Sequence, residues 1–584
     1  MTARLLIFPA LLLAQVLLGA GFMPTAAYAE RGPAPRPAVA QNDYALEARV
    51  IVKYKAGSTL VQALSAPRLA DARPQHAAAL AQHLRVPLTN GRVLGRHTQG
   101  LLGSGLSSLQ LAARLAALPE VEWAVPDQRR YIAAAPNDPY FADGQTTITP
   151  VVGQWYLRAP DSTAVSAINA VGAWNLTTGS GALTVAILDT GVRLDHPDLA
   201  GKLHPGYDFV QDSITGSDGD GRDADASDPG DWSSAGACGF GSSARNSSWH
   251  GTQVAGLIGA ATNNSVGMAG AGRNVMLLPV RVLGRCGGYD SDIIAAMRWA
   301  AGLSSEVGFD SPVTLVNNHP ARVVNMSLGS DGACPASYRE AVAELSAAGV
   351  SVVVAAGNDA GRAVNTPANC AGAIAVAGVR HVGSKVGYSN VGPEVTVAAP
   401  AGNCVNLAGP CLYPLLTTDN SGTDKPADHT YSDGTKATLG TSFATPLVAG
   451  TVGLMLSANP GLTPAQVKAA LQASARPFPN SGGDPSAPVC HAPNGVDQVE
   501  CYCTTSTCGA GLLDAAQAVA KALEPQPVIV SAPPTAAAGT APPGSSGGGT
   551  WGWGWMLALA AVLLVGHRSR YAGQQAPADL PRST

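Results

Sequence analysis

The sequence predicts an α/β fold, a parallel β-sheet with helices on both faces, for residues 136–524 of this 584-residue chain. Short apolar runs typical of buried strands alternate there with longer apolar segments typical of helices. Turn residues such as Gly, Asn and Asp follow several of the apolar runs. Such alternation indicates strand-helix-strand units, in which parallel strands are covered by the connecting helices.

The expected elements follow one another regularly along this region. We expect strands over 183–189, 275–283, 321–327, 350–356 and 373–379. We expect helices over 250–261, 290–302, 337–348, 442–458 and 463–475, and a C-terminal helix over 512–523.

Residues near 42–135 form a separate unit with a different pattern. A strand is expected over 48–54, an apolar helix over 109–118 and a second strand over 121–125. This pattern predicts a small α+β unit. The turn-rich segment 136–139 reads Pro-Asn-Asp-Pro and is a junction where the next domain begins.

Composition limits the functions open to this chain. Charged residues make up 13%, about half the usual share. The net charge of −4 is small for this length, and basic residues form no stripe with interleaved aromatics. The sequence therefore excludes nucleic acid as an expected partner.

The N-terminus predicts export. Arg4 precedes an apolar run over 5–22, and Ala27-Tyr28-Ala29 is the small-x-small pattern of a signal-peptide cleavage site. We expect cleavage after Ala29, so that residues 1–29 are a signal peptide; a retained transmembrane anchor is the alternative. Ten cysteines, all between 238 and 508, suit disulfides in an oxidising compartment.

Three motifs place reactive side chains at the ends of predicted elements. Residues 185–191 carry Asp189 at the end of a buried strand, residues 250–256 begin a helix at His250, and residues 440–446 carry Ser442 after a glycine at the start of an apolar helix. Taken singly, these residue types are usually a turn residue, a surface histidine and an N-cap. Their occurrence in order within one region favours a shared function.

On these motifs the chain resembles the subtilisin-like serine proteases over about two thirds of its length, because Asp, His and Ser occur in the family's chain order. The resemblance implies a catalytic triad of Asp189, His250 and Ser442, with the Asn358 amide as a donor to the oxyanion. It also implies that the strand edge in residues 325–329 pairs with the substrate backbone. The expected substrate-binding residues are Ser327, Leu328, Gly329, Ala355, Ala356 and Gly357.

These residue types suit acyl transfer to water. A serine hydroxyl needs a neutral imidazole to take its proton, which is the role expected of His250. Asp189 would hold the tautomer of His250 and stabilise the imidazolium. The oxyanion would lie between the Asn358 amide and the Ser442 N–H, at about 3 to 4 kcal/mol per donor.

Calcium is the expected cofactor, at two places. The resemblance implies Asp198, Asn264 and Gln154 as ligands of the family's calcium site. Independently, the glycine-rich insertion 208–231 holds eight aspartates and one arginine, and a hard cation with tolerant geometry would gather such carboxylates. The candidate ligands there are Asp218, Asp220 and Asp223; a solvated acidic loop is the alternative.

Local spacing predicts three disulfides around loops of the catalytic region. The expected pairs are Cys334 with Cys370, Cys404 with Cys411, and Cys238 with Cys286. The remaining four allow three connectivities, and their spacing lacks the paired C-x2-C arrangement of zinc sites. These four are Cys490, Cys501, Cys503 and Cys508.

The flanking regions predict processing. Residues 30–135 resemble an inhibitory propeptide of the family, and a small binding domain that stays attached is the alternative. Residues 525–550 form a Pro/Ala/Gly/Ser linker, 551–570 an apolar segment with a basic stop, and 571–584 a polar tail. The apolar segment resembles bacterial glycine-rich sorting tails and is expected to contact a membrane or a sorting enzyme, or to be removed.

We therefore expect an exported, bacterial, monomeric serine endopeptidase of broad specificity, made as a self-processing zymogen. Its partners would be protein or peptide substrates and its own propeptide. Two alternatives remain. One is a processing or peptide-cyclising enzyme of narrow specificity, and the other is an inactive surface binding protein on a protease fold.

Overall fold

The computed structural model describes residues 47–58, 80–82, 84–95, 97–127, 135–142, 152–303, 306–307, 313–403, 411, 413–433 and 438–524. The predictions for the signal peptide, the linker and the apolar tail lie outside these ranges. So do most of the residues at the expected propeptide junction, 128–134.

The region 152–524 is built on a seven-stranded sheet in the order β13-β12-β11-β10-β5-β7-β6, and each pair of neighbours is parallel. The α/β prediction is confirmed. The five expected strands are all present, with ends within two residues of those expected, and β6 and β13 are additional. The strands are β5 (Thr184–Asp189), β6 (Tyr207–Asp208), β7 (Met276–Arg281), β10 (Val323–Met326), β11 (Ser351–Ala355), β12 (Ile374–Val379) and β13 (Val395–Pro400).

The helices also follow the expected pattern, with one correction. The C-terminal helix α11 begins three residues later than expected, because the Asp514 side chain caps it by accepting from the Gln517 N–H. Leu512 instead pairs with Ala398 and Arg476. The longer helices are α6 (His250–Gly259), α7 (Asp290–Ala300), α8 (Ala336–Ala347), α9 (Thr441–Ala458), α10 (Pro464–Ser474) and α11 (Ala515–Leu523).

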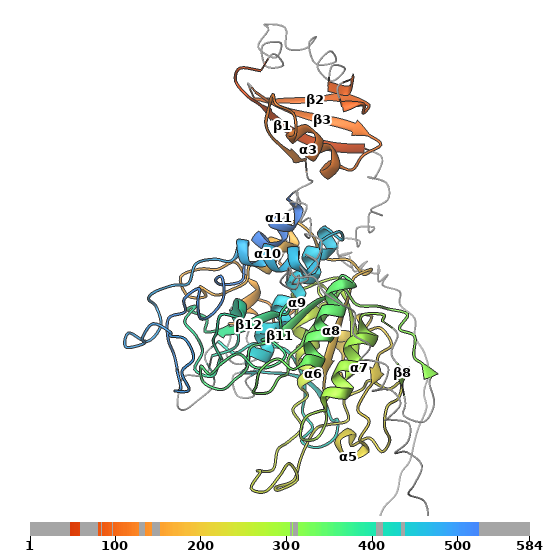
Figure 1. Cartoon of the computed structure of the whole chain (residues 1–584), viewed down its shortest axis with the longest axis vertical. Helices are drawn as coiled ribbons and strands as arrows, with labels where there is room; N and C mark the ends of the chain where they lie inside the picture. Colours follow the sequence, from red (N-terminus) through yellow and green to blue (C-terminus); the bar gives the residue numbers. More distant parts are fainter. Residues whose placement is uncertain are drawn as a thin grey trace, which may run out of the picture. The chain divides into compact units, whose positions relative to one another are not determined.

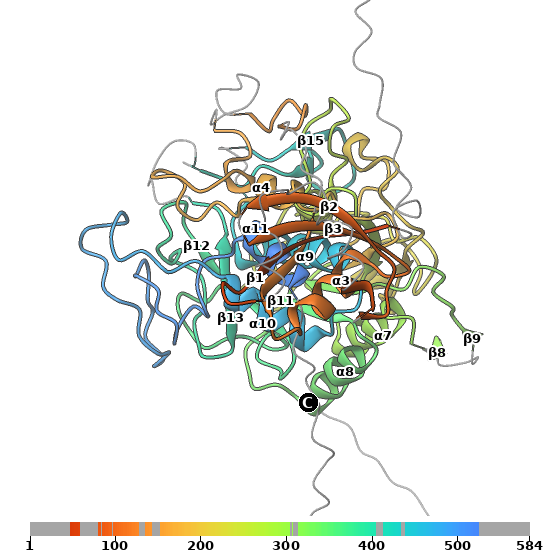
Figure 2. The same cartoon turned by 90° about the horizontal axis from the view of Figure 1, so that it is seen from above.

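Alternating side chains of each strand enter two different cores. Val185 and Ile187 pack with the apolar faces of α6, α9, α10 and α11, whereas Ala186 and Leu188 pack with α7 and α8. Helices α7 and α8 lie side by side, as Figures 1 and 2 show. The sheet is thus buried on both faces, which explains why its strands are continuous apolar runs.

The strand order reverses beside β5. From β5 the chain passes to β6 and β7, which lie on one side of β5. It then passes to β10, β11, β12 and β13, which lie on the other side. Asp189 ends β5, and Ser327 directly follows β10, so both lie at the carboxyl edge of neighbouring strands. A crevice at such a reversal is the usual ligand site of α/β sheets.

The N-terminal unit is an antiparallel sheet in the order β2-β3-β1-β4 with helix α3 against it (Figure 1). The expected α+β pattern is correct, but β2 and β3 were not predicted from the sequence. β2 contains Asn90-Gly91, which is typical of a turn, and its pairing with β3 is irregular. Ser107 and Gln110 form a capping box at the start of α3. The elements are β1 (Glu47–Tyr54), β2 (Leu88–Gly95), β3 (Thr98–Ser104), α3 (Ser108–Ala116) and β4 (Val121–Pro126).

Several short elements complete the described chain. The hairpin of β14 and β15 lies beside α6, whose Thr252 and Gln253 carbonyls accept from the hydroxyls of Thr418 and Thr417. These elements are η2 (Trp155–Leu157), α4 (Ala170–Trp174), η3 (Pro197–Leu199), α5 (Ser213–Gly216), β8 (Glu306–Val307), β9 (Val313–Thr314), β14 (Thr418–Asn420) and β15 (His429–Tyr431).

Candidate active site

Asp189 lies fully buried at the carboxyl end of β5. Its Oδ1 accepts a hydrogen bond from the Thr190 N–H at 2.8 Å and contacts His250 Nδ1 at 2.7 Å. The second oxygen, Oδ2, has no hydrogen-bond partner among the described residues. The carboxylate therefore directs its charge and its hydrogen bond at one ring nitrogen of His250.

His250 is the first residue of α6, and the glycine that follows it allows its close approach to Asp189. A Cβ on Gly251 would lie 2.1 Å from the Gly191 carbonyl oxygen, so a side chain there would push the helix away from the end of β5. Burial lowers the pKa of His250, but the charge and hydrogen bond of Asp189 outweigh it, so the pKa is raised above 6.5. Asp231 and Asp228 contribute further in the same direction.

Ser442 is the second residue of α9, which begins after Gly440. The φ of Gly440 is +149°, a conformation that side chains rarely adopt. The Ser442 Oγ donates to the Ser327 carbonyl at 3.1 Å. Ser442 and His250, both within the described residues, form no hydrogen bond with each other. The ring of Phe443 lies 5.1 Å from the ring of His250, centroid to centroid. Ser442 is thus a neighbour of His250 with its hydroxyl turned to the β10 edge.

Helix α9 is long and apolar enough to cross a membrane, but 83% of it is buried inside the described structure. It lies in the core against α6 and α11. A buried helix of this length fixes Ser442 rigidly relative to β5 and β10.

Asn358 follows β11 and lies beside the start of α9. Its Oδ1 accepts from both the N–H and the Oγ1 of Thr441, at 2.9 and 3.0 Å. With the carbonyl oxygen of the amide held in this way, its NH₂ group faces the cavity shared with Ser442. A cavity of about 270 Å³ lies there, lined by Ser327, Leu328, Gly329, Ala355, Gly357, Asn358, Asp359, Asn365, Thr441 and Ser442.

Five of the six expected substrate-binding residues therefore line one cavity beside Ser442. Ala356 does not line it and is buried in the core. Two further lining residues, Asp359 and Asn365, were not predicted from the sequence. Asp359 Oδ2 accepts from Asn365 Nδ2 at 3.0 Å and from Asn390 Nδ2 at 2.9 Å, so the carboxylate is fixed at the cavity wall.

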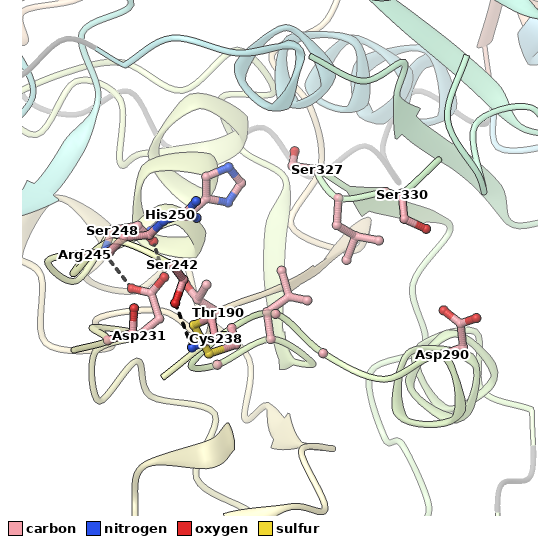
Figure 3. Close-up of a pocket in the computed structure, with 18 of the residues that line it drawn as sticks. Thr190, Asp231, Cys238, Ser242, Arg245, Ser248, His250, Asp290, Ser327 and Ser330 are labelled. Carbon is pink, nitrogen blue, oxygen red and sulfur yellow. Dashed lines mark hydrogen bonds between the residues drawn. A yellow bond between two sulfur atoms is a disulfide. The ribbon is translucent and has the colours of Figure 1, made fainter. Parts of the chain in front are cut away.

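A larger cavity of about 690 Å³ extends from His250 along the edge that follows β10 (Figure 3). One wall is the segment 231–248, and the opposite wall is Ser327, Leu328, Gly329 and Ser330. Both cavities share Ser327, Leu328 and Gly329. Together they form a continuous cleft past Ser442 and His250.

Two of the expected family-type calcium ligands lie in contact, and the third lies nearby. Asp198, fully buried, accepts from Asn264 Nδ2 at 2.9 Å and from the Met268 N–H at 2.8 Å. Gln154 instead bonds to the backbone of Ala269, at 2.7 Å through each end of its amide. Burial raises the pKa of the Asp198 carboxyl to about 6.

Asp138 joins this group, although it was not predicted from the sequence. It is buried and accepts from the backbone N–H groups of Asn263 and Asn264 at 3.0 and 3.3 Å. Burial raises the pKa of its carboxyl above the usual range. The only signal was an aspartate in a turn-rich junction, which sequence alone does not distinguish from an ordinary turn residue.

The acidic insertion is organised by two arginines. Arg281, at the end of β7, is buried and pairs with the carboxylates of Asp208 and Asp218. Arg222 pairs with Asp292 of α7 at 2.6 Å. The carboxylate oxygens of Asp218, Asp220 and Asp223 do not all lie within 4.8 Å of one another. These three side chains are therefore not gathered around one point in this structure.

Two buried residues behind the Asp189–His250 pair were not recognised from the sequence. Thr190 Oγ1 accepts from the Gly251 N–H at 3.0 Å and donates to Asp228 Oδ2 at 2.7 Å. Asp228, counted above among the acidic residues of the insertion, is fully buried, and burial raises its carboxyl pKa to about 7. Thr190 could have been identified from its place beside Asp189 in the Asp-Thr-Gly sequence, whereas nothing in the sequence indicates that Asp228 is buried.

The structure pairs Cys238 with Cys286 and Cys334 with Cys370, which are two of the three pairs expected from the sequence. Cys404 lies outside the described residues. Of the three connectivities left open, the structure has Cys490–Cys501 and Cys503–Cys508. The sulfurs of Cys490, Cys503 and Cys508 are therefore disulfide sulfurs and do not form a metal knuckle.

Comparison with known proteins identifies the family. The model of the subtilase family, peptidase S8, matches residues 180–511. An extracellular protease of Xanthomonas campestris pv. campestris is 38% identical over 491 residues, which cover 81% of this chain and 73% of that protein. Thermitase of Thermoactinomyces vulgaris is 32% identical over 348 residues, 59% of this chain and 94% of that protein.

A solved structure of a protease is also similar to this chain. A protease of Pseudoalteromonas arctica superposes with a TM-score of 0.55 and 39% identity, over 67% of this chain and 100% of that chain. The chain belongs to the subtilase family and is a subtilisin-like serine endopeptidase.

Proposed function

We propose that this enzyme is an exported endopeptidase of broad specificity in which Asp189, His250 and Ser442 form the catalytic triad. The observation that carries the proposal is the 2.7 Å contact of Asp189 Oδ1 with His250 Nδ1, beside the helix start that bears Ser442. Because Nδ1 donates to Asp189, the other nitrogen, Nε2, is left as the base in the neutral ring. This is the tautomer that a serine nucleophile requires.

In the proposed mechanism the Ser442 hydroxyl turns from the Ser327 carbonyl toward His250 when a substrate occupies the cleft. Its Oγ then attacks the scissile carbonyl carbon while its proton passes to His250 Nε2. Asp189 stabilises the imidazolium through the existing hydrogen bond and stays ionised. His250 next protonates the leaving amine, and the acyl-enzyme is hydrolysed by water in the reverse sequence of proton transfers.

The proposed oxyanion donors are the Asn358 NH₂ group and the Ser442 N–H. Thr441 holds the Asn358 carbonyl oxygen, so the amide is oriented before substrate arrives. The Ser442 N–H lies in the first turn of α9, where N–H groups have no partner within the helix. Preorganised donors of this kind are typically worth about 3 to 4 kcal/mol each in the transition state.

We propose calcium as a structural cofactor, bound by Asp138, Asp198 and Asn264. Two buried carboxylates with raised pKa values are costly without a cation, and nearby donors to Asp198 are neutral groups: Asn264, the Met268 N–H and the Tyr431 hydroxyl. Carboxylate and amide oxygens are the ligands that calcium takes. Bound there, it would stabilise the fold without taking part in the chemistry.

Residues 30–135 are proposed to be a propeptide that the enzyme removes itself. The support is a separate antiparallel sheet with its own core, which includes Val50, Val52, Leu101 and Leu111. We expect cleavage within 132–136, giving a mature N-terminus close to Pro136. Edman sequencing and intact mass of the secreted protein test this. Fully active enzyme that begins near residue 30 would contradict it.

The tail beyond Glu524 is proposed to act only in localisation. Helix α11 already closes the core, with Ala518, Val519 and Ala522 buried. Truncation after Glu524 should therefore preserve specific activity and change only where the enzyme is found. Loss of folding in the truncated enzyme would show instead that the tail belongs to the core.

The triad is tested by substitution and labelling. Ser442→Ala should leave an unprocessed precursor without proteolysis, and an organophosphonate should label Ser442 stoichiometrically in the unaltered enzyme. Asn358→Ala should reduce turnover by roughly 100- to 1000-fold, the usual cost of one oxyanion donor. Full casein hydrolysis by purified Ser442→Ala would exclude the assignment.

A further inference from the structure

The cavity of about 690 Å³ beside His250 has two ends of different chemistry (Figure 3). Ser248, Asp231 and Arg245 lie near His250, and Asp290 lies at the far end, beyond Ser330. The cavity continues from the proposed catalytic residues along the strand edge 327–330. A peptide bound in the cleft would therefore meet Asp290 at a distance from the scissile bond.

The wall formed by 231–248 is held in place. The Ser233 and Arg245 backbones exchange hydrogen bonds of 2.9 and 2.8 Å, and Asp231 accepts from the N–H and the hydroxyl of Ser248 at 2.6 and 2.9 Å. The Cys238–Cys286 disulfide ties the segment to the loop that precedes α7. The cavity is thus preformed, and little ordering is needed when a ligand enters.

Asp290 offers a fixed carboxylate to this cavity. It is the first residue of α7 and is exposed, and its Oδ1 accepts from the Tyr338 hydroxyl at 2.9 Å. Tyr338 is itself buried, so it fixes the direction of the carboxylate. Within the described ranges no ion pair engages Asp290, and Oδ2 remains able to accept a further hydrogen bond.

The basic side chains near the cavity are directed elsewhere. The Arg285 guanidinium lies 4.6 Å from the Trp232 ring centroid and donates to the Trp232 carbonyl at 3.1 Å. Arg245 lies at the opposite end of the cavity from Asp290 (Figure 3). The far end of the cavity therefore has an unneutralised negative charge.

An extended substrate brings alternate side chains into the two cavities. If its backbone pairs with residues 327–329, the residue before the scissile bond enters the cavity beside Ser442. The second and fourth residues then face the larger cavity, since side chains alternate along a strand and neighbours on one face are about 7 Å apart. The second would lie near His250 and the fourth near Asp290.

We infer that Asp290 is a specificity-determining residue, which selects substrates with arginine or lysine at the fourth position before the scissile bond (P4). This inference rests on the proposed function, because it requires peptide in the cleft. A guanidinium or ammonium reaching Asp290 Oδ2 would make a charge-assisted hydrogen bond that a neutral side chain of the same shape cannot make. The specificity of the enzyme would then be broad at the other positions and biased at P4.

The alternative is that Asp290 serves only the fold. An acidic residue in the first turn of a helix is favourable there, and the Tyr338 hydroxyl needs an acceptor. Such a role would affect the stability of the enzyme and would change the cleavage of all substrates equally. A dependence of cleavage on the charge at P4, removed by substitution of Asp290, is specific to a substrate contact.

The test uses acetyl-Xaa-Ala-Ala-P1 aminomethylcoumarin substrates, with Xaa as arginine, citrulline or glutamate and P1 as the residue cleaved fastest. Citrulline has nearly the shape of arginine without its charge. We expect kcat/KM for arginine to exceed that for citrulline about tenfold, mainly through KM, with glutamate lowest. Asp290→Asn should reduce the arginine-to-citrulline ratio to near one.

Two control variants separate this effect from general ones. Asp290→Glu keeps the charge and should retain most of the ratio. Asp331→Asn removes an exposed carboxylate next to Ser330 that does not line the cavity, and should leave the ratio unchanged. The acetyl-Ala-Ala-P1 substrate, which does not reach P4, should be cleaved equally by the unaltered enzyme and by Asp290→Asn.

The outcomes distinguish this inference from the proposed function. A folded Asp290→Asn enzyme that keeps the tenfold ratio would overturn the role of Asp290 while leaving the triad in place. Failure of the unaltered enzyme to cleave any substrate would count against the proposed function instead. In that event, calorimetric binding of arginine and citrulline peptides to the unaltered enzyme, which would cleave neither, still decides the P4 preference, because equal affinities overturn it.

Discussion

Two groups of carboxylates in this protein, one around the buried Asp208 and one around the buried Asp198, have different partners. Asp208 and Asp218 face the guanidinium of Arg281, which is itself buried. The hydrogen bonds to Asp138 and Asp198 come from amide, hydroxyl and backbone N–H groups. Arg273 acts on Asp138 through its charge, but the two form no ion pair among the described residues. We therefore expect a cation at Asp138 and Asp198, where no ion pair is formed, rather than in the insertion, although the insertion is the segment richest in aspartate.

The largest expected effect comes from removing Arg281. Arg281→Met would leave Asp208 and Asp218 without their counter-charge and the Gly216 carbonyl without its donor. We expect a loss of about 3 to 5 kcal/mol in the free energy of unfolding, the usual cost of breaking a buried pair. Urea unfolding in the Ser442→Ala background, which avoids autolysis, measures it without the charge screening that a guanidinium salt would add.

Calcium should not restore the stability of Arg281→Met. If millimolar calcium did restore it, the carboxylates of the insertion would be able to gather a metal ion on their own. The proposed difference between the two groups would then be wrong.

The next effect is that of calcium on the unaltered fold. Removal with EGTA should lower the thermal midpoint, because a ligand at 100 times its Kd stabilises the native state by about 2.7 kcal/mol. Asp198→Asn should abolish this dependence, and Asp220→Asn, an exposed change in the insertion, should not. Differential scanning calorimetry with and without EGTA gives both results. Calcium dependence that is lost in Asp220→Asn and kept in Asp198→Asn would reverse the assignment.

Asp189 differs from both groups, because its partner is the imidazole of His250, which carries a charge only when it is protonated. The pKa of His250 is raised, so the pair stabilises the fold below about pH 6.5 and loses this contribution as the pH rises through the raised value. Catalysis needs the neutral ring and therefore has the opposite dependence. We expect kcat/KM to fall as the pH decreases, with a midpoint above 6.5.

Asp231 provides a small test of the electrostatics at His250. Its charge contributes to the raised pKa, less than that of Asp189. Asp231→Asn should therefore move the acid limb of the pH profile of kcat/KM to lower pH. An unchanged or raised midpoint would show that Asp231 does not act on His250 through its charge.

The smallest effect is expected at an exposed pair. Arg298 and Glu344 lie 2.6 Å apart with side chains 32% and 42% exposed. Glu344→Gln should change the unfolding free energy by less than about 1 kcal/mol, because solvent screens the pair. Urea unfolding of both variants, Glu344→Gln and Arg281→Met, compares the exposed pair with the buried one. Equal losses of unfolding free energy would refute the view that burial sets the size of the effect.

Much of the fold could be predicted from sequence because both faces of the central sheet are buried. Strands such as β5 and β11 are then continuous apolar runs, which are visible without any partner. β6 is only two residues long, and β13 follows the run that forms β12 without a helix between them, so neither gave a separate signal. In the N-terminal unit, β2 was hidden by Asn90-Gly91.

The candidate site was predictable to the extent that its residues lie in local motifs. Asp189, His250, Asn358 and Ser442 each sit at the end of an element whose apolar run is recognisable. Asp290 is also at a helix start, but nothing local indicates that it lines a cavity. Asp138 and Asp359 are aspartates in turns, and their roles depend on residues more than 20 positions away.

The sequence by itself determined the α/β class, the order of the three reactive residues and the apolar elements that position them. Only the tertiary structure decided which carboxylates are buried and which cation each one meets. The physical reason is that strand and helix patterns repeat over a few residues, whereas the pairing of Arg281 with Asp208 joins residues 73 positions apart. Charge compensation is a property of the space around a group, and that space is assembled from distant segments.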